Sequence, residues 1–413
     1  MIVRSLKMRN FRGIGNLDID FQKRINIFVG MNGSGKSSVL ACLAKMLSLM
    51  IYRVYNNRRQ SFPFSEFDIR NAVHNLDVEI TISNDEGNSL CSWKMNLARD
   101  GSKGNQISDL TKYIELVHDK IEQDESSPIP VVASYSVVRA VLDIPQRIRN
   151  RHVFDTRFSG FESAIHGSSD FRLFFEWFRE REAFVNGMIL DGKSDFTDHQ
   201  FSSVCDAITR LTGFKNLRIR RFPQKMILEK EGETLDIEQL SDGEKCLMAM
   251  VGDMAMRLAI ANPLRQDPLN AQAVFLIDEI DLHLHPAWQR MIMPGLVEVF
   301  PNCQFIVSTH STQILTHIKP GNIFLLKRSN EGIVMTQPSD SYGQTQDSLY
   351  EDIMGVPTRP DDIRMQFRAL YDAIDSNNLT DARDKLQELS KTIGSDPDLV
   401  KAGILIKRKG SSQ

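Results

Sequence analysis

The feature that most restricts the fold is a glycine-rich segment at residues 30–37, which has the sequence GMNGSGKS. It fits the pattern G-x-x-x-x-G-K-[ST] without a substitution. An apolar run at residues 25–29 precedes the segment, and a stretch of helical character follows from Val39. A strand, a glycine-rich loop and a helix in this order are the context in which the pattern forms a phosphate-binding loop. The segment therefore predicts an α/β fold of the P-loop type.

The chemistry of such a loop assigns roles to its residues. Backbone N–H groups of the glycine-rich turn close around the phosphates of a nucleotide. The amine of Lys36 reaches the β and γ phosphates, and the hydroxyl of Ser37 binds Mg²⁺. We predict that ATP is bound here by Asn32, Gly33, Ser34, Gly35, Lys36, Ser37 and Ser38. Lys36 is also predicted to be catalytic.

Two further apolar runs end in polar residues of the kind that complete such a site. Residues 273–277 read as a buried parallel strand, and the carboxylates of Asp278 and Glu279 follow it. We predict that Asp278 holds Mg²⁺ together with Ser37 and that Glu279 orients and deprotonates the attacking water. The second run, residues 304–309, ends at His310. That histidine is predicted to contact the γ-phosphate, and the alternative is a polar cap at the end of a strand.

Between these strands and the loop lies the segment LSDGEK at residues 240–245. Five segments follow one another along the chain: the phosphate-binding loop, the LSDGEK segment, the strand that ends in Asp278, the turn at 281–286 and the segment 308–311. In this order the chain resembles ABC-type ATPase heads of the SMC, RecF and OLD kind. Residues 6–13 are similar to the opening strand of these heads. The resemblance implies a central mixed sheet with helices and an additional antiparallel β subdomain.

The resemblance also implies where the second half of the site lies. Ser241 and Gly243, with Glu244 beside them, would contact the γ-phosphate of ATP bound by another copy of the chain. Asp281 would begin the loop that links the two sites. A monomer would then hydrolyse ATP poorly. Asp242 stands where the commonest signature has glycine, and the sequence alone offers no physical reason for it.

Periodicity divides the chain into four predicted parts. Alternating apolar residues at 76–82 and 90–97 indicate a hairpin, and helical spacing appears at 171–178 and 201–211. Sustained heptads are absent, which excludes a long coiled coil. The predicted parts are an N-terminal lobe with the phosphate loop (1–154), a short helical arm (155–215), a C-terminal lobe with signature and strand-tip residues (216–341), and a helical partner-docking module (342–413).

Several arginines are candidates for further contacts. Arg12, close to Phe11, is predicted to approach the adenine, although Phe11 can equally belong to the core. Arg139 follows a predicted strand and either faces the edge of the nucleotide or forms a surface salt bridge. The densest basic cluster comprises Arg147, Arg149, Arg151 and Arg157. It either grips a phosphate backbone or forms a solvated or partner-binding surface.

Composition excludes several classes of protein. The formal net charge of −3 gives no overall attraction for polyanions, so any nucleic-acid contact must be a local patch. The five cysteines lack paired spacing, which predicts reduced and buried thiols. We find neither a secretory segment nor an 18-residue apolar span, and predict a cytoplasmic protein without a membrane partner.

The short arm, the helical tail and the lack of an acidic nuclease-like set after residue 327 refine the resemblance. The chain is similar over nearly its whole length to Septu (PtuA-like) antiphage ATPases, which also occur beside some retrons. This implies a head-to-tail dimer or higher homo-oligomer that controls a separate HNH nuclease. Contact with DNA, or with a retron reverse transcriptase and its msDNA, is a further option. Two alternatives stay open: a RecF-like or SMC-like repair ATPase that binds DNA directly, and a slow-turnover ATP-binding scaffold.

Overall fold

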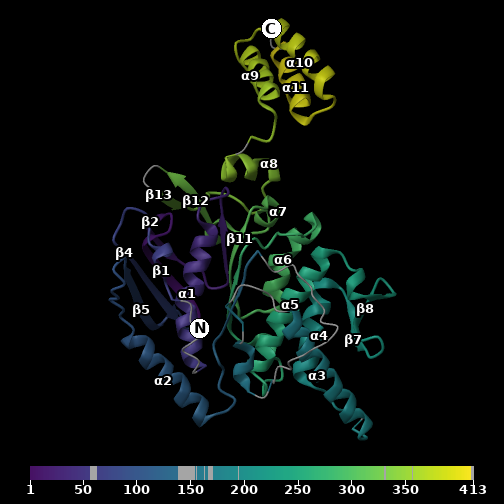
Figure 1. Ribbon diagram of the computed structural model, residues 1–413. Coiled ribbons are helices and arrows are strands. Elements are labelled where there is room, and N and C mark those ends of the chain that lie inside the picture. Colours follow the sequence, from purple (N-terminus) through teal and green to yellow (C-terminus); the bar gives the residue numbers. More distant parts are fainter. Residues whose placement is uncertain are drawn as a thin grey trace. The chain divides into compact units, whose positions relative to one another are not determined.

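The computed structural model describes residues 1–55, 63–137, 154, 156–161, 163–165, 171–193, 195–329, 332–355 and 357–410. They form two compact units, an N-terminal unit (Met1–Thr345) and a C-terminal unit (Gln346–Gln413). Figure 1 shows both units. The four parts expected from periodicity, with their three boundaries, stay predictions.

A six-stranded sheet forms the centre of the N-terminal unit, with the strand order β13-β12-β3-β11-β10-β6. All neighbours pair in parallel except β13, which is antiparallel to β12. Each residue of β10 and β11 is buried, as expected of strands covered on both faces. The strands are β3 (Ile25–Val29), β6 (Val131–Tyr135), β10 (Ala273–Ile277), β11 (Gln304–Thr309), β12 (Ile323–Ser329) and β13 (Gly332–Thr336). Because five of them run in parallel, their carboxyl ends meet at one edge of the sheet.

Two smaller sheets flank the centre. The antiparallel sheet β2-β1-β4-β5 contains the hairpin expected from the sequence, and β7-β8-β9 is a second antiparallel sheet. In Figure 1 the first lies at the left of the N-terminal unit and the second at its right. Their strands are β1 (Ile2–Phe11), β2 (Ile14–Asp20), β4 (Asn75–Ser83), β5 (Ser89–Ala98), β7 (Lys215–Arg220), β8 (Lys225–Lys230) and β9 (Glu233–Asp236). Helix α2 (Ser108–Gln123) packs against β5.

The helices of the expected arm pack against the helix that begins within the LSDGEK segment. Helix α5 (Asp242–Ala261) is buried along most of its length beneath α3 (Phe171–Leu190) and α4 (His199–Thr212). A Cβ atom on Gly252 of α5 would lie 2.8 Å from the ring of Phe174 in α3, so the two helices are in direct contact. Helix α6 (Pro286–Val299) packs against α4 and α7 (Thr312–Leu315).

Helix α1 (Lys36–Val54) corrects one expectation. By length and composition it is apolar enough to cross a membrane, with a mean hydropathy of 1.4, although no such span was expected. However, 61% of the apolar window is buried inside the protein, and the helix begins at the lysine of the phosphate loop. It is therefore a core helix of the N-terminal unit.

The C-terminal unit has its own hydrophobic core. After the short helix α8 (Gln346–Leu349) it consists of α9 (Asp361–Asp375), α10 (Leu379–Ile393) and α11 (Pro397–Gly410). Buried residues from all three long helices, among them Leu370, Leu389 and Ala402, form one cluster. The helix pair and third helix expected from the sequence are thus present, while a docking role for them stays a prediction.

Candidate nucleotide-binding site

The glycine-rich segment forms a tight loop between β3 and α1. Gly30, Gly33 and Gly35 have φ angles of +152°, +78° and +101°, a region that side chains rarely adopt. At Gly30 an added Cβ would also lie 2.3 Å from the carbonyl oxygen of Leu326 in β12. The loop geometry therefore requires glycine, and the backbone is left bare for close approach of a phosphate.

Two polar side chains of the loop are positioned for such a ligand. The Nζ of Lys36 donates to the carbonyl oxygens of Gly30 at 2.8 Å and Met31 at 3.2 Å, so the amine lies across the mouth of the loop. Burial lowers the pKa of Lys36, and the nearby carboxylates of Asp278 and Glu279 oppose this effect. The Oγ of Ser34 is buried and has no hydrogen-bond partner among the described residues. Glycine geometry, the amine and this unpaired hydroxyl together fit a bound nucleotide phosphate.

The carboxylates expected at the end of β10 lie beside the end of β11. The Ser308 hydroxyl at the end of β11 donates to Asp278 and accepts a hydrogen bond from the backbone N–H of Glu279 at 2.8 Å. Glu279 has a φ of +48°, an unusual backbone conformation for a residue other than glycine. Such conformations persist where surrounding contacts impose them, and the hydrogen bond that the Glu279 N–H donates to Ser308 is a contact of this kind.

The turn after Glu279 is tied to the residue predicted to sense the γ-phosphate. Asp281 accepts hydrogen bonds from the Thr309 hydroxyl at 2.6 Å and from the backbone N–H of His310 at 3.3 Å. Burial and the positive charge of Lys36 lower the pKa of His310, which keeps the imidazole neutral at neutral pH. A neutral imidazole at this edge of the sheet can donate one hydrogen bond to a phosphate oxygen.

Magnesium fits the same edge. Ser37 and Asp278 line one cavity of about 200 Å³ between α1 and the end of β6. A hydroxyl and a single carboxylate are a typical protein contribution to a Mg²⁺ site, because Mg²⁺ keeps waters and takes phosphate oxygens as its other ligands. Within the described part of the chain, no group of three or more His, Cys, Asp or Glu residues could hold a metal by itself.

The LSDGEK segment caps helix α5. Ser241 is the N-cap residue, and its side chain and that of Glu244 each bond the other's backbone N–H, as in a capping box. Burial raises the pKa of Glu244, but hydrogen bonds from Lys230 and Ser241 outweigh this and lower it. The carboxylate of Asp242 is 84% exposed at the first position of the helix. An acidic residue there stabilises the positive end of the helix dipole, which gives the departure at Asp242 a physical reason.

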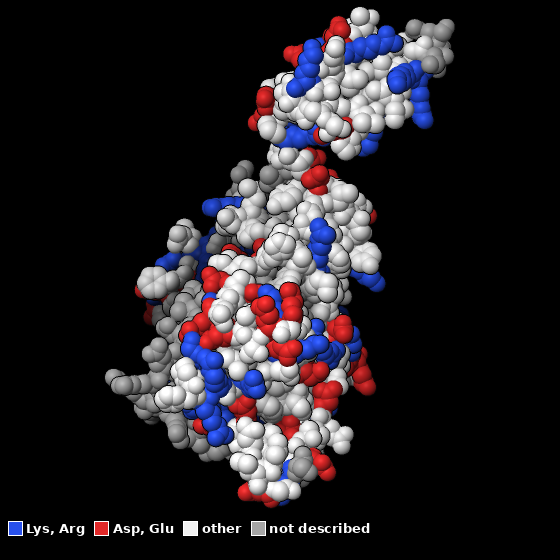
Figure 2. Space-filling model, turned by 90° about the vertical axis from the view of Figure 1, so that its right-hand side faces the viewer, with Lys and Arg blue, Asp and Glu red and all other residues white. Residues whose placement is uncertain are grey.

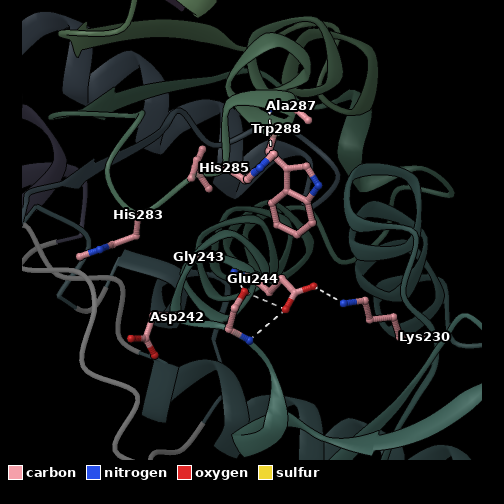
Figure 3. A pocket seen from close by; sticks show the side chains of 10 residues that line it. Lys230, Asp242, Gly243, Glu244, His283, His285, Ala287 and Trp288 are labelled. Atoms are coloured by element: carbon pink, nitrogen blue, oxygen red, sulfur yellow. Dashed lines mark hydrogen bonds and ion pairs between the residues drawn. The ribbon is translucent and has the colours of Figure 1, made fainter.

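A pocket of about 830 Å³ opens next to this cap. Figure 3 shows Glu244 held by Lys230 on one side of the pocket and the indole of Trp288 facing it. The first residues of α5 and α6 both line the pocket, so two positive helix ends point into it. A Cβ on Gly243 would lie 2.2 Å from the carbonyl oxygen of His283, so the signature and the turn that follows Glu279 are in direct backbone contact.

A buried polar network connects α5 with the strand beside β10. The Oδ2 of Asp253 accepts hydrogen bonds from the Tyr135 hydroxyl and from the Arg257 Nε, both at 2.7 Å. All three residues are at most 1% exposed. The carbonyl oxygen of Tyr135 in turn accepts from the backbone N–H of Asp278 at 2.8 Å. The signature helix is thereby linked to the carboxylate predicted to hold the metal.

The predicted arginine contacts have different outcomes. The Nε and Nη2 of Arg12 each lie 3.1 Å from Asp68 Oδ1, and the guanidinium stacks on Phe11, which is buried in the core. A contact of Arg12 with adenine stays a prediction. Arg157 donates to the carbonyl oxygens of Glu125, Ser127 and Ala261, so its guanidinium is engaged within the fold. Arg139, Arg147, Arg149 and Arg151 lie outside the described residues.

The loop residues Asn32, Gly33 and Ser37 are exposed, while Lys36 is buried and Ser38 is partly buried. Sequence reasoning did not assign roles to Ser308, Lys230 or the Tyr135 network. Ser308 lies near the end of an apolar run, close to the expected His310, and this position could have indicated a role in the site. Nothing in the sequence places Lys230 beside Glu244.

Comparison with known proteins agrees with this geometry. A family model described as "AAA domain, putative AbiEii toxin, Type IV TA system" matches residues 25–316. The matched region begins at β3, includes the phosphate loop, the signature and both strand tips, and ends just after α7.

Three relatives match most of the chain. The Retron Ec83 probable ATPase of Escherichia coli is 29% identical, over 87% of this chain and 77% of that protein. The Retron Vc95 probable ATPase of Vibrio cholerae is 28% identical, over 82% and 76% respectively. The Septu protein PtuA of Bacillus thuringiensis is 22% identical, over 86% and 85%. The similarity to Septu and retron ATPases that was expected from the sequence is confirmed.

Proposed function

This chain belongs to the AAA-domain family and is an ATPase with an α/β ABC-type head, and we propose that two copies close head to tail around two ATP molecules. Each ATP, with its Mg²⁺, would lie between the phosphate loop of one copy and the signature of the other. ATP binding favours the closed pair, and hydrolysis reopens it.

The observation that carries this proposal is the separation, within one chain, of the two surfaces that we propose to bind phosphate. The phosphate loop and the strand tips form one surface, and the capped end of α5 lines a different pocket. The residues that line the pocket at α5 and the cavity at Ser37 do not overlap. A helix N-terminus that is open to solvent and bears a signature sequence is suited to a phosphate presented from outside the chain.

In the proposed closed state, each residue has a defined task. The loop N–H groups and Lys36 hold the β and γ phosphates, and Ser37 and Asp278 hold Mg²⁺, which offsets charge on the phosphates. Glu279 accepts a proton from the attacking water, and His310 donates a hydrogen bond to the γ-phosphate. Ser241 and the N–H groups at Gly243 and Glu244 contact that phosphate from the second copy. The groups of the loop and strand tips and the groups of the signature surround the phosphate together only when two chains meet.

Mixing two inactive variants tests the composite site. Lys36→Ala removes the phosphate contact of the loop, and Ser241→Arg blocks the signature. Each variant alone should be inactive, but in a mixed pair the intact loop of one chain meets the intact signature of the other. Random pairing puts half of the dimers in the mixed form with one working site of two, so turnover should recover to about one quarter of the wild-type value.

The matched control mixes two variants that are damaged in the same half of the site. Lys36→Ala with Glu279→Gln leaves no complete site in any pair, so this mixture should stay inactive. If the Lys36→Ala and Ser241→Arg mixture also stays inactive while both variants are folded, the composite site is refuted.

We further propose that the ATPase acts in the cytoplasm as the regulatory part of an antiphage system with a separate HNH nuclease. The names of the Septu and retron relatives support a place in such a system, and the nuclease partner follows from the resemblance to Septu ATPases. We expect an HNH protein from an adjacent reading frame to co-purify with the chain, and its cleavage of DNA to change when ATP is removed. Cleavage that is the same with wild-type protein and with Glu279→Gln would contradict control by the ATPase.

A further inference from the structure

The hairpin formed by β7 and β8 presents positive charge and an aromatic ring to solvent. Residues 221–224 connect the two strands, and Phe222 in this turn is 94% exposed. Along β7, Arg218 and Arg220 alternate with Leu217 and Ile219, so the arginines share the outer face of the strand. Figure 2 looks onto the side of the N-terminal unit that carries this sheet and shows Lys and Arg atoms there beside Asp and Glu atoms.

The cations of the hairpin differ in how far they are neutralised. Lys225 lies 2.6 Å from Asp236 and 3.1 Å from Glu238, and Arg220 lies 3.9 Å from Asp236. Among the described residues, neither Arg218 nor Arg221 forms an ion pair. The nearby Glu182 binds the backbone N–H of Ile219 with both carboxylate oxygens. Burial raises the pKa of Glu182, and the charges of Arg221 and Arg218 oppose this rise. Neither guanidinium forms an ion pair within the described part of the chain, so both can still bind a ligand.

We propose that this hairpin binds single-stranded nucleic acid. Guanidinium groups bind phosphate oxygens through two parallel hydrogen bonds, and Arg218 and Arg221 are free to do so. Phe222 follows Arg221 in the turn, and its exposed ring offers a flat face on which an unpaired base can stack. A base inside a duplex has both faces covered, so the exposed ring favours a single strand. The net charge of −3 makes such a local cluster necessary for any attraction to a polyanion.

The surface lies outside the proposed ATP site. Residues 218–222 line neither the pocket at the signature nor the cavity at Ser37. Binding of nucleic acid at the hairpin can therefore be measured independently of nucleotide turnover. Variants of the hairpin should keep the basal ATPase rate of the wild-type protein.

Fluorescence anisotropy of the full-length protein with labelled single-stranded oligonucleotides, one of DNA and one of RNA, tests the proposal. We expect at least one of them to bind more tightly than the matched duplex. Replacing both arginines (R218Q/R221Q) should reduce the slope of log affinity against log salt by about 1.4, because each contact to a single strand contributes about 0.7. Phe222→Ala should weaken binding about fivefold or more and leave the slope unchanged, because the loss is one of stacking.

The control is the double variant K112Q/K120Q, which removes the same charge from exposed positions of α2. It should bind like the wild-type protein, and all variants should have the wild-type melting temperature. Absence of binding by the wild-type protein at low salt overturns the proposal. It is also overturned if the hairpin variants bind like the wild type, if the duplex binds equally well, or if the variants lose only the association with a protein partner.

Discussion

Replacing the buried Asp253 by alanine tests whether the network between α5 and β6 stabilises the N-terminal unit as its geometry indicates. The carboxylate is fully buried, and its Oδ2 accepts hydrogen bonds from Tyr135 and Arg257 at 2.7 Å. Arg257 is 1% exposed, so it cannot turn to water when its partner is removed. Alanine at this position therefore removes the carboxylate that the buried guanidinium of Arg257 pairs with through its Nε.

The expected magnitude follows from the burial of both partners. Breaking a buried ion pair by removal of one member costs about 3–5 kcal/mol. Tyr135→Phe removes one hydrogen bond but leaves the charge pair in place, and it should cost only about 1 kcal/mol. The double variant D253L/R257M removes both charges and should recover most of the loss, because apolar replacements of a buried pair are often neutral or stabilising.

Urea unfolding followed by tryptophan fluorescence measures these differences in one unit. The three tryptophans, Trp93, Trp177 and Trp288, all belong to the N-terminal unit, so the signal does not include unfolding of the C-terminal helices. If Asp253→Ala lowers the free energy of unfolding no more than Tyr135→Phe does, the charge on Arg257 is not compensated by Asp253. The reasoning from burial is then refuted.

Three further outcomes follow from the site and the core. Gly243→Ala forces the backbone away from the His283 carbonyl and should lower the turnover number by about tenfold or more; an unchanged turnover number contradicts the contact. Burial and the charge of Lys36 lower the pKa of His310 in the folded protein. On acidification the histidine therefore binds a proton more readily in the unfolded state, and the free energy of unfolding should fall as the pH drops below about 6.5. Urea unfolding at neutral and at mildly acidic pH measures this loss of stability. His310→Asn should lose less stability between the two pH values than the wild-type protein does, and an equal loss in both proteins contradicts a contribution of His310. Burial raises the pKa of the Cys91 and Cys303 thiols to about 12. Both should therefore react with a disulfide reagent at mildly alkaline pH only after unfolding, and rapid reaction in the native protein would contradict their burial.

The parts of the fold that were predictable from the sequence are those with short-range determinants. The strand expected at residues 25–29 has these bounds in the structure because the glycine at position 30 ends it with a φ that a strand cannot continue. The apolar runs at β10 and β11 are buried on both faces, so their composition alone identifies them. The signature was recognised by its resemblance to ABC-type heads, and its local structure is also short-range, because Ser241 and Glu244 form a capping box three positions apart.

The remaining features depend on contacts between distant segments. Tyr135 and Asp253 are 118 positions apart in the chain, and only the packing of α5 against β6 brings them together. The sheet β7-β8-β9 was not expected, since β7 has a single buried residue, Leu217, and otherwise reads as a polar stretch. The contact of Lys230 with Glu244 depends on this unexpected sheet. Long-range packing of this kind leaves no periodic pattern in the sequence.

The close approach of Gly243 to the His283 carbonyl has a consequence for ATP saturation curves. In the proposed closed pair, Gly243 contacts the nucleotide of the second copy. His283 belongs to the segment that follows Glu279, and Glu279 faces the nucleotide bound by its own chain. A shift of one segment must displace the other, because no side-chain volume separates them. Free-energy coupling between two sites is reciprocal, so occupancy of either site alters affinity at its neighbour. The pair of sites should therefore show cooperative ATP binding, with a Hill coefficient above one and a ceiling of about two set by the number of sites.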